Sequence, residues 1–557
     1  MSYYLTYQRG YPMIQRSFPS REVLIGGVPV GCDHPVRLQS MTKVPANDVN
    51  TTVDQCIRAF AAGADFMRIG VPDEQAVRAF HDIKKQLTNA GYNHPLIADI
   101  HYNPRLATEV ARIADKVRIN PGNFGGTNDK NEQPESVGKR YNDLRNFIET
   151  CREHGTAIRI GANTGSLRPG ILRKYGRTPE ALVESVMEYL YLFEELGFFN
   201  TVVSLKTSDP LQTIEAYRTL CARMQQEDRC YPLHTGVTEA GQGDSGRIVS
   251  ALGISILLQE GIGDTIRVSL TEPPEQEIYF AKSILHTIHN YTTQQKAPCK
   301  QTAGKDNASS ALSPLPKQET ESKPVIITKD GDFTPEKLNA RELFLVKERL
   351  DKNDLQKLRN AHQPMVVLDV PDELFPGLMK DLETLGQSNI NAPLLMPKLA
   401  CLNAPGDLWL CQLTLLYGRF LANGKLHGFW VDMAITEASE RIIQNIKDLL
   451  QYTGVTHTHT TFISCPGCSR TSIDIQALAE AVKSKFPDYP DCKIAIMGCT
   501  VNGLGEMADA GYGLLGNANG KINMYAGGVL IEKNVRQDMA IETLEALINQ
   551  RKQNTKK

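Results

Sequence analysis

Between residues 36 and 270 the chain alternates two patterns of apolar and polar positions. Short runs rich in β-branched residues each end on a polar or charged residue, and stretches with apolar residues at helical spacing separate them. The stretches 51–62 and 178–196 are predicted helices, and the second begins with a helix-starting Thr-Pro pair. The strand-like runs occur at 36–41, 66–70, 96–101, 117–123, 157–163, 201–206, 233–239 and 265–270.

Eight strand–helix units over about 250 residues match a (β/α)8 TIM-type barrel in size and alternation better than they match an open sheet. After residue 288 the pattern changes. Residues 290–323 are rich in Thr, Gln, Lys, Ser and Pro with few large apolar residues, which predicts a flexible linker. The predicted organisation is α/β: a TIM-type barrel over 1–289, this linker, a middle α/β insert over 324–452 and a C-terminal α/β domain over 453–557.

Beyond the linker the pattern predicts individual elements, but no chemistry in the middle insert. The insert contains both tryptophans, Trp409 and Trp430, and no grouping of catalytic residue types, so we interpret it as a spacer or docking domain. The predicted elements are a strand at 365–370, helices at 372–385 and 434–452, and, in the C-terminal domain, a helix at 473–483 and a strand at 493–497.

Composition and charge limit the cellular compartment and the classes of binding partner that we expect. With 557 residues the chain is too long for one core, and 61 basic against 63 acidic residues leave a net charge of -2, which provides no overall field for nucleic acid or an anionic membrane. The N-terminal residues do not resemble a signal peptide, and no run approaches the length of a membrane span. Twelve cysteines are too sparse for a disulfide scaffold. We expect a cytoplasmic protein with free thiols.

Three cysteines near the C-terminus have the spacing of ligands to one soft metal centre. Cys465 and Cys468 form a Cys-x2-Cys pair, which lets both sulfurs turn to the same side, and Cys499 supplies a third thiolate. Glu506, seven residues after Cys499, is a candidate for a fourth, more easily displaced ligand. A structural zinc site, a redox dithiol or simply buried thiols are the alternatives, and Cys492 is a minor rival ligand.

Polar residues gather where the eight runs end, which is where catalytic groups lie on a barrel of this type. Four arginines and a lysine among them predict a cup with excess positive charge, suited to a diphosphate. For any single arginine the alternative is an ion pair with a neighbouring helix. The residues predicted to bind substrate are Arg68, Asp99, Arg118, Asn120, Arg159, Asn163, Lys206, Arg267 and Ser269.

Two further features of the predicted cup concern phosphate and protons. The loop from Gly241 to Gly246 satisfies G-x-G-x-x-G, but it follows the seventh run rather than the first, so we interpret it as a phosphate cradle and not as a dinucleotide site. Glu239 is the candidate general acid, with His101 as its competitor. Neighbouring cations are expected to oppose a raised pKa of Glu239.

Together these motifs resemble those of the 4-hydroxy-3-methylbut-2-enyl diphosphate synthase family, iron–sulfur enzymes of the non-mevalonate isoprenoid pathway. The resemblance implies a 4Fe-4S cluster held by Cys465, Cys468, Cys499 and Glu506. It implies reductive ring opening of 2-C-methyl-D-erythritol 2,4-cyclodiphosphate, with two electrons from ferredoxin or flavodoxin. The matching stretches, besides the cysteine motifs, are Gln39–Thr42, Ala98–His101, Arg118–Asn123, Arg159–Gly161, Asn163–Leu167, Thr238–Gly241, Glu260–Thr265 and Arg267–Leu270.

Two departures from the family pattern matter. Leu504 stands where the family usually has proline before the Gly-Glu pair, and the middle insert resembles the three-domain form of the family, whose middle domain is similar to a degenerate barrel. In the two-domain form the cluster domain of one subunit covers the barrel of its partner. We expect the insert to let one chain cover its own barrel, as a monomer or a homodimer. The rivals are a barrel enzyme with a structural zinc module and a thiol–disulfide protein.

Overall fold

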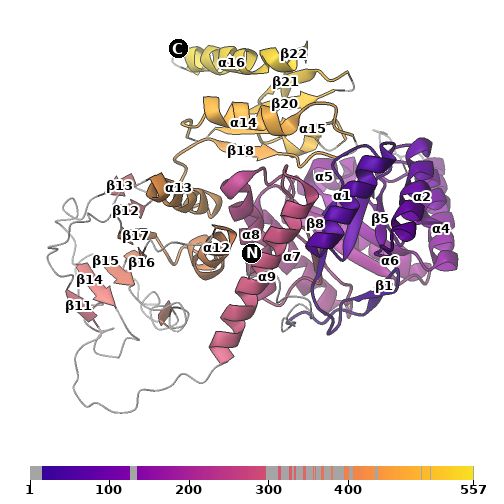
Figure 1. Ribbon diagram of the computed structural model, residues 1–557, viewed down its shortest axis with the longest axis horizontal. Coiled ribbons are helices and arrows are strands. Elements are labelled where there is room, and N and C mark those ends of the chain that lie inside the picture. Colours follow the sequence, from indigo (N-terminus) through magenta and orange to yellow (C-terminus); the bar gives the residue numbers. More distant parts are fainter. Residues whose placement is uncertain are drawn as a thin grey trace. The chain divides into compact units, whose positions relative to one another are not determined.

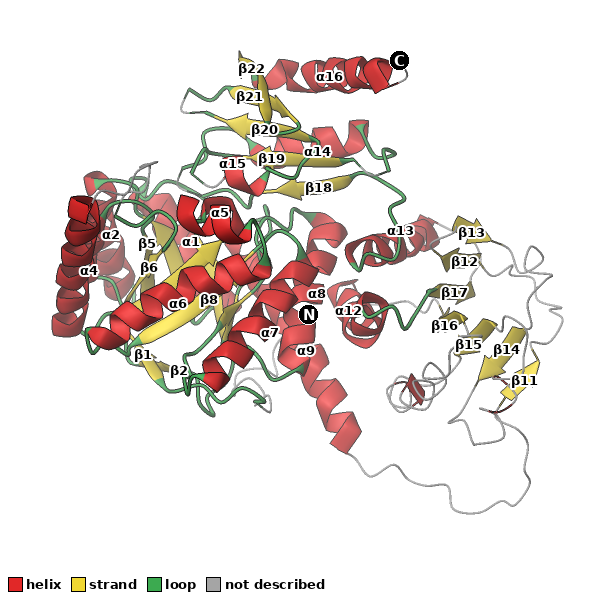
Figure 2. Ribbon diagram, turned by 180° about the vertical axis from the view of Figure 1, so that it is seen from behind, coloured by secondary structure: helices red, strands yellow, loops and turns green. Residues whose placement is uncertain are grey.

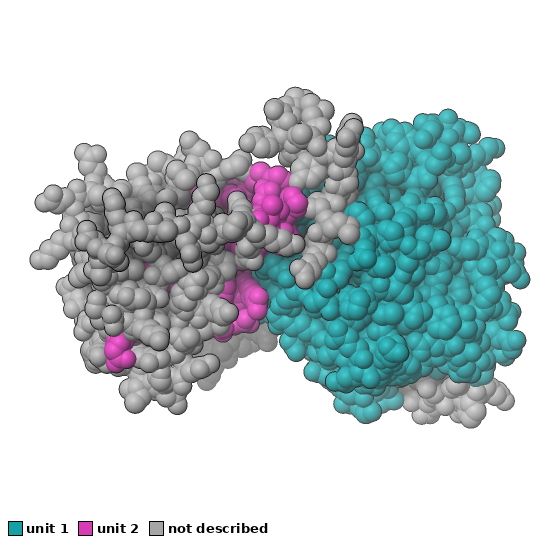
Figure 3. Space-filling model, turned by 90° about the horizontal axis from the view of Figure 1, so that it is seen from below, with its two compact units in different colours: residues 1–285, 459–557 teal, residues 286–458 magenta. Residues whose placement is uncertain are grey.

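The computed structural model describes residues 16–125, 134–296, 406–432 and 437–555, except 469, 491, 502 and 518, together with short stretches between 312 and 400. The chain forms two compact units (Figure 3). Unit 1 contains residues 1–285 and 459–557, and unit 2 contains residues 286–458. No helix in the described part of the chain is long and apolar enough to cross a membrane.

Unit 1 contains the predicted barrel. Its eight strands pair in parallel in the order β8-β7-β6-β5-β4-β3-β10-β9, and a parallel bridge between Val203 and Leu233 joins the two ends of this series. All eight predicted runs are therefore confirmed as strands. They are β3 (Arg37–Met41), β4 (Phe66–Gly70), β5 (Leu96–Asp99), β6 (Lys116–Ile119), β7 (Ala157–Asn163), β8 (Thr201–Lys206), β9 (His234–Thr235) and β10 (Thr265–Ile266).

Helices follow the strands and surround them (Figure 1). The two helices predicted from periodicity are present, and their starts have local causes: the Asp48 side chain accepts the Thr51 N–H, and Thr178 accepts the Ala181 N–H with Pro179 in the first turn. The helices are α1 (Val49–Ala62), α2 (Glu74–Asn89), α3 (Pro104–Ala111), α4 (Pro134–His154), α5 (Pro169–Tyr175), α6 (Pro179–Glu195), α7 (Pro210–Gln226), α8 (Gly243–Gln259) and α9 (Pro274–Lys296), with a short turn η1 (Thr164–Ser166).

A β-hairpin that the sequence pattern did not predict closes the end of the barrel away from the C-terminal domain (Figure 2). Its strands β1 (Val23–Ile25) and β2 (Val28–Val30) are antiparallel. Val23, Ile25 and Val30 pack on apolar residues near the beginnings of four barrel strands, Phe66, Ile97, Ala157 and Val202. The barrel therefore has an apolar floor, and polar chemistry is confined to its mouth.

The C-terminal domain is a five-stranded sheet in the order β18-β19-β20-β21-β22, with β18, β19 and β20 parallel. The predicted strand at 493–497 is confirmed as β19, and the predicted helix at 473–483 is α14, which begins two residues later because Asp474 caps it. The elements are β18 (Thr461–Ser464), α14 (Ile475–Lys485), β19 (Lys493–Met497), α15 (Gly503–Glu506), β20 (Tyr512–Gly516), β21 (Ile522–Ala526), β22 (Val529–Val535), η3 (Gln537–Met539) and α16 (Ala540–Thr555).

Unit 2 contains a seven-stranded mixed sheet in the order β11-β14-β15-β16-β17-β12-β13. Part of the predicted strand at 365–370 is confirmed as β15, and the predicted helix at 434–452 as α13, but the predicted helix at 372–385 lies mostly outside the described residues. The elements are β11 (Leu312–Pro314), β12 (Val325–Thr328), β13 (Gly331–Phe333), β14 (Leu343–Val346), β15 (Met365–Leu368), β16 (Leu394–Ala400), α12 (Gly406–Ala422), β17 (Gly428–Asp432) and α13 (Glu437–Tyr452).

Several predictions from the sequence concern unit 2 and the segment predicted as a linker. Trp430 is buried on β17, and Trp409 is half-buried on α12. The segment 290–323, predicted as a linker, contains the end of α9 and all of β11, and its other residues lie outside the described part. The predicted domain boundaries stay predictions.

A buried tyrosine ties two barrel strands together and gives a stability prediction. Tyr217 on α7 donates to the His234 carbonyl at 2.5 Å and accepts the Leu205 N–H at 3.0 Å. Replacing Tyr217 by Phe leaves both backbone groups buried without this partner, so we expect the free energy of unfolding to fall by about 1–3 kcal/mol in urea titrations. Tyr191→Phe, which removes an exposed phenol bonded to Glu227, should cost clearly less. Equal losses would contradict the assignment.

Candidate functional site

A cavity of about 100 Å³ lies between the barrel mouth and the C-terminal domain, inside unit 1. Three cysteines line it from the C-terminal domain: Cys465 and Cys468 after β18, and Cys499 after β19. The barrel side of the same cavity contains every predicted substrate residue except Asn120, together with both candidate acids. These are Arg68, Asp99, His101, Arg118, Arg159, Asn163, Lys206, Glu239, Arg267 and Ser269.

Asn120 is buried but does not line the cavity. Its amide nitrogen donates to the Ser166 hydroxyl at 2.6 Å, and its oxygen accepts the Gly122 N–H at 2.9 Å. A Cβ on Gly122 would stand 1.5 Å from the Ser166 carbonyl oxygen, so the two loops meet backbone to backbone. In this structure Asn120 braces the mouth loops, and its predicted contact with substrate stays a prediction.

Three groups at the ends of β5 and β6 form a buried polar cluster. Arg118 Nη1 lies 3.2 Å from Asp99 Oδ1 and 2.8 Å from His101 Nε2. Burial disfavours the Asp99 carboxylate, but Arg68 and Arg118 outweigh burial and hold the Asp99 pKa well below its usual value. Burial, and then Arg118, lower the pKa of His101 to about 3. His101 is therefore neutral at physiological pH.

The five cations predicted for the mouth differ in their partners. Arg118 has Asp99, and Arg267 lies 3.2 Å from Glu277 on α9, so the alternative of an ion pair with a helix applies to Arg267. The other three have no carboxylate within ion-pair distance among the described residues. Arg68 contacts the Met41 sulfur, Lys206 donates to the Gly236 carbonyl at 2.8 Å, and Nε and Nη1 of Arg159 have no hydrogen-bond partner in the described structure.

Glu239 sits in the cavity in a strained conformation. Its backbone has φ 57°, a left-handed conformation uncommon outside glycine, and its side chain is 5% exposed. Burial first, and then the nearby Glu506, raise its pKa well above the ordinary value. The sequence led us to expect that neighbouring cations would oppose such a rise. Lys493 does lower the pKa of Glu239, but burial and the acidic neighbour outweigh it.

The three thiols have different surroundings. The Gly498 N–H donates to Cys465 Sγ at 3.2 Å, and burial raises the Cys465 pKa to about 12. A hydrogen bond with Cys499 lowers the Cys468 pKa to about 5 and raises that of Cys499. Cys492 precedes β19 whereas Cys499 follows it, so the rival ligand lies at the other end of that strand.

Glu506 reaches from α15 toward the barrel. It is 3% exposed, and neither carboxylate oxygen has a partner that meets hydrogen-bond geometry within the described structure. A Cβ on Gly165 would lie 2.9 Å from the Glu506 backbone nitrogen, and a Cβ on Gly505 would lie 1.7 Å from the Gly165 carbonyl oxygen. The barrel and the C-terminal domain therefore touch through two glycines, which bring this carboxylate next to Glu239, although Glu506 itself does not line the cavity.

These donors fit an iron–sulfur cluster. Thiolates are its usual ligands, and the buried carboxyl group of Glu506, which lies beside Glu239 and Asn163, provides a weaker fourth ligand. No group of three or more His, Cys, Asp or Glu side chains in the described ranges converges closely enough to hold one metal ion. A cluster does not need that convergence, because each of its ligands binds a separate corner iron.

Arg470 is the site residue that sequence reasoning missed. From the C-terminal domain it donates to the Asp99 carbonyl at 3.2 Å, lies 3.6 Å from Asp99 Oδ2, and places Nη1 4.0 Å from Cys468 Sγ. It thus links a barrel strand end to a cysteine. Its position directly after the Cys-x2-Cys-Ser motif was the only signal, and nothing local to that motif indicated Asp99 as its partner.

The glycine-rich loop does not act as the predicted phosphate cradle. None of its residues lines the cavity, and the Gly243 N–H at the start of α8 donates to the Glu272 carboxylate at 2.9 Å. Glu272 is in turn held by Arg247 at 2.6 Å. The loop instead contacts the C-terminal domain, because Lys483 donates to the Gln242 carbonyl at 3.4 Å, and Ala240 just before the loop forms a parallel bridge with Ser464.

Two protein-family models match this chain, one over the barrel and one over the C-terminal domain. A family model described as the GcpE TIM-barrel domain matches residues 20–282, and one described as the GcpE protein C-terminal domain matches residues 461–550. The chain is 32% identical to the chloroplastic 4-hydroxy-3-methylbut-2-en-1-yl diphosphate synthase (ferredoxin) of Arabidopsis thaliana, over 95% of this chain and 87% of that one. The chain belongs to the 4-hydroxy-3-methylbut-2-en-1-yl diphosphate synthase family.

Bacterial members of this synthase family align over similar shares. The proteins of Parabacteroides distasonis and Porphyromonas gingivalis, both named 4-hydroxy-3-methylbut-2-en-1-yl diphosphate synthase (flavodoxin), are 33% and 34% identical, each over 94% of this chain and over 97% and 96% of their own. Coverage this complete extends across the middle insert. The resemblance recognised from the motifs and the TIM-barrel fold are confirmed.

One buried cation of the synthase barrel gives a pH-dependent prediction. Lys116 on β6 is fully buried, its amine has no hydrogen-bond partner in the described structure, and it lies 5.1 Å from the Phe66 ring centre. Burial lowers its pKa well below 10.5. Because the pKa of Lys116 is lower in the folded than in the unfolded chain, the folded protein loses stability as the pH falls below the pKa of the unfolded chain. Lys116→Met should therefore raise the Tm at pH about 7, and this gain in Tm should disappear toward pH about 10. Thermal melts across this range test it. Lys84→Met, at a more exposed lysine paired with Asp115, should show no such gain.

Proposed function

We propose that this chain reduces 2-C-methyl-D-erythritol 2,4-cyclodiphosphate to 4-hydroxy-3-methylbut-2-enyl diphosphate and water, with two electrons from ferredoxin or flavodoxin. One observation carries the proposal: three thiols and a group of cations without carboxylate partners line the same buried cavity. The names of the relatives supply the product and the two kinds of donor. We also propose a cytoplasmic location, where the cysteines of the described residues, which form no disulfide in this structure, would stay reduced.

Cys465, Cys468, Cys499 and Glu506 would hold a 4Fe-4S cluster. When bound, the cluster supplies electrons singly and offers an iron site that can accept an oxygen of the substrate. Arg470 would help to orient the Cys468 thiolate, because its guanidinium lies between the Asp99 carbonyl and the Cys468 sulfur. The Gly498 N–H at Cys465 would stabilise a second thiolate.

Arg68, Arg159 and Lys206 would bind the diphosphate. They come from β4, β7 and β8, they have no carboxylate partner among the described residues, and burial makes a naked cation costly, so an anionic ligand relieves each of them. Arg118 and Arg267 would add charge from fixed positions, because Asp99 and Glu277 already hold them.

Glu239 is better placed than His101 to donate the proton that converts the departing hydroxyl group into water. Glu239 Oε2 is buried without a hydrogen-bond partner in the described structure, and the side chain lines the cavity between the barrel and the cysteines. His101 is already engaged by Asp99 and Arg118. The single proton needed for loss of a hydroxyl group as water would therefore come from the carboxyl group.

Metal analysis of protein purified without oxygen tests the proposal. We expect about four irons and four sulfides per chain, a brown chromophore, and turnover of the cyclodiphosphate. Glu506→Ala should change the visible spectrum and lower the iron content toward three per chain. Asp509→Ala is the matched control, because it removes an exposed carboxylate three residues away that pairs only with Lys493 in the described contacts.

The rival functions predict other results. Stoichiometric zinc and a colourless protein would indicate a barrel enzyme with a structural metal module. Activity that needs Cys465 and Cys468 but neither Cys499 nor Glu506 would indicate a thiol–disulfide protein. Either result removes the reductive reaction.

A further inference from the structure

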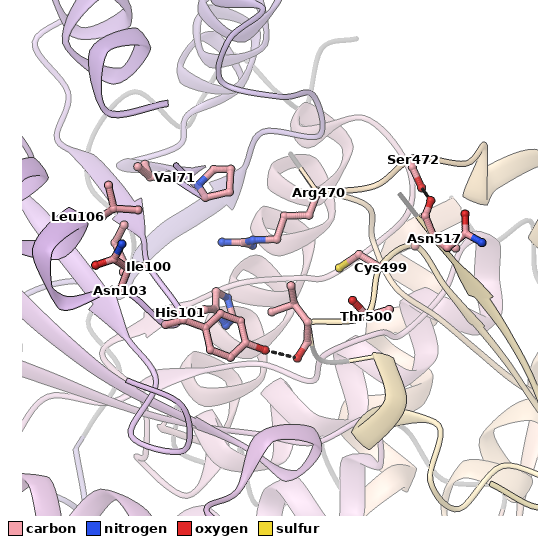
Figure 4. A pocket seen from close by; sticks show the side chains of 15 residues that line it. Val71, Ile100, His101, Asn103, Leu106, Arg470, Ser472, Cys499, Thr500 and Asn517 are labelled. Carbon is pink, nitrogen blue, oxygen red and sulfur yellow. Dashed lines mark hydrogen bonds between the residues drawn. The ribbon is translucent and has the colours of Figure 1, made fainter. Parts of the chain in front are cut away.

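A second, larger cavity of about 430 Å³ lies beside the first, between the loops after β4 and β5 and the C-terminal domain. Figure 4 shows its two walls, with Ile100, Asn103 and Leu106 from the barrel facing Cys499 and Thr500. Much of the barrel wall is apolar. Among the lining residues Arg470 is the only one with a permanent charge, and no carboxylate contributes. We call this space the outer cavity.

The two cavities share a wall. Cys499, Arg470, His101, Gly498 and Val501 line both of them. Of the three cysteines only Cys499 reaches the outer cavity, where it is half-buried. The cations that would hold the diphosphate line the inner cavity and not the outer one, so a protein docked at the outer cavity would leave the substrate's binding groups free. Cys499 therefore offers the approach to the cluster site that does not compete with substrate.

The rim of the outer cavity has the character of a transient protein contact. Tyr102 is 48% exposed and its hydroxyl donates to the Val501 carbonyl at 3.1 Å, which holds the ring beside the loop that follows Cys499. Thr500, next to Cys499 in the same wall, is exposed. An exposed aromatic side chain beside a redox ligand suits the small, short-lived interfaces of electron-transfer partners.

We propose that the outer cavity is the docking site of a reduced flavodoxin, whose flavin edge enters the recess beside the Tyr102 ring and the Cys499 loop. This inference rests on the proposed function. A flat, apolar ring edge fits a recess with an apolar wall, and the absence of carboxylates from the lining leaves nothing to repel a reduced, anionic flavin. Each encounter oxidises the flavin by one electron and reduces the cluster by one electron. Two encounters supply both electrons, and no atom is transferred.

The test measures binding of oxidised flavodoxin, with its flavin mononucleotide, to the cluster-loaded full chain, followed by flavin fluorescence. Tyr102→Ala should raise Kd about tenfold, since truncating an aromatic anchor at a small interface removes much of its affinity. Tyr102→Phe keeps the ring and loses only the bond to Val501, so its Kd should stay within about twofold of the original. Phe199→Ala is the matched control, because Phe199 is 47% exposed just before the start of β8, at the end of the barrel away from the mouth.

Turnover driven by a small chemical reductant separates docking from the reaction itself. With such a reductant, Tyr102→Ala should match Tyr102→Phe, which also lacks the bond to Val501, while its flavodoxin-driven turnover falls below that of Tyr102→Phe with the lost affinity. Unchanged flavodoxin binding in Tyr102→Ala overturns the docking site, as does equal weakening in Tyr102→Ala and Tyr102→Phe, which would indicate a structural role for the hydroxyl. Binding of a ferredoxin but not of flavodoxin would show that flavodoxin is not the protein that docks at the outer cavity. Failure of the proposed function is distinct, because the unaltered protein would then turn over with neither reductant.

Discussion

Replacing Gly165 by alanine is expected to lower kcat/KM for the cyclodiphosphate about 100-fold while leaving the iron content unchanged. The new Cβ would stand 2.9 Å from the Glu506 backbone nitrogen, a distance at which one backbone must move. That movement separates the barrel mouth from the cysteines, and displacements of about 1 Å between reacting groups cost this much in rate. Steady-state kinetics with a chemical reductant, together with iron analysis, measure both quantities.

Gly170 provides the control for Gly165. It lies on α5, five residues further along, and a Cβ there meets nothing within 4 Å. Gly170→Ala should therefore keep full activity and iron content. A Gly165→Ala protein as active as Gly170→Ala would show that the close approach of Gly165 to Glu506 is not needed for turnover.

A mixture of two inactive variants is expected to remain inactive. Arg159→Met removes a cation of the barrel mouth, and Cys468→Ser removes a cluster ligand, so each alone should lose at least about 1000-fold in activity. In this structure a single chain brings its C-terminal domain onto its own barrel, through Arg470 and Asp99 and through Tyr102 and Val501. Mixing therefore cannot combine an intact barrel with an intact cluster.

If the C-terminal domain of one subunit instead covered the barrel of its partner, the mixture would regain activity. Random pairing of the two variants would then restore about a quarter of the sites. Co-expression followed by turnover assays distinguishes the two results. The unaltered protein mixed with each variant shows whether either variant inhibits. A recovery near a quarter would contradict closure within one chain.

Local pattern was sufficient to predict the barrel strands and most of the residues at its mouth. Strands buried on both faces appear as short apolar runs, and the fold itself places their carboxyl ends together. The runs were predicted too long where the ladder ends early. Residues 236–239 leave β9 to enter the mouth, and Glu239 takes a left-handed conformation that no strand pattern encodes.

What the sequence could not predict depends on partners distant along the chain. Arg470 meets Asp99 across 371 positions, and Glu506 meets Gly165 across the same two domains. The phosphate cradle was wrong because Glu272, from another loop, already occupies the start of α8. The roles of the site residues stay predictions, since shared lining of a cavity does not establish what each group does.

The hairpin of β1 and β2 has a consequence for how substrate enters the barrel and product leaves it. It seals the lower end of the barrel with packed aliphatic side chains, while the C-terminal domain covers the upper end. A charged substrate cannot pass through that apolar floor, so it has to enter and leave on the side of the C-terminal domain. The described contacts that hold the cover include single polar links and a bridge between backbones rather than one large apolar core, which suits repeated release. We therefore expect the strength of these contacts to influence how fast substrate enters and product leaves.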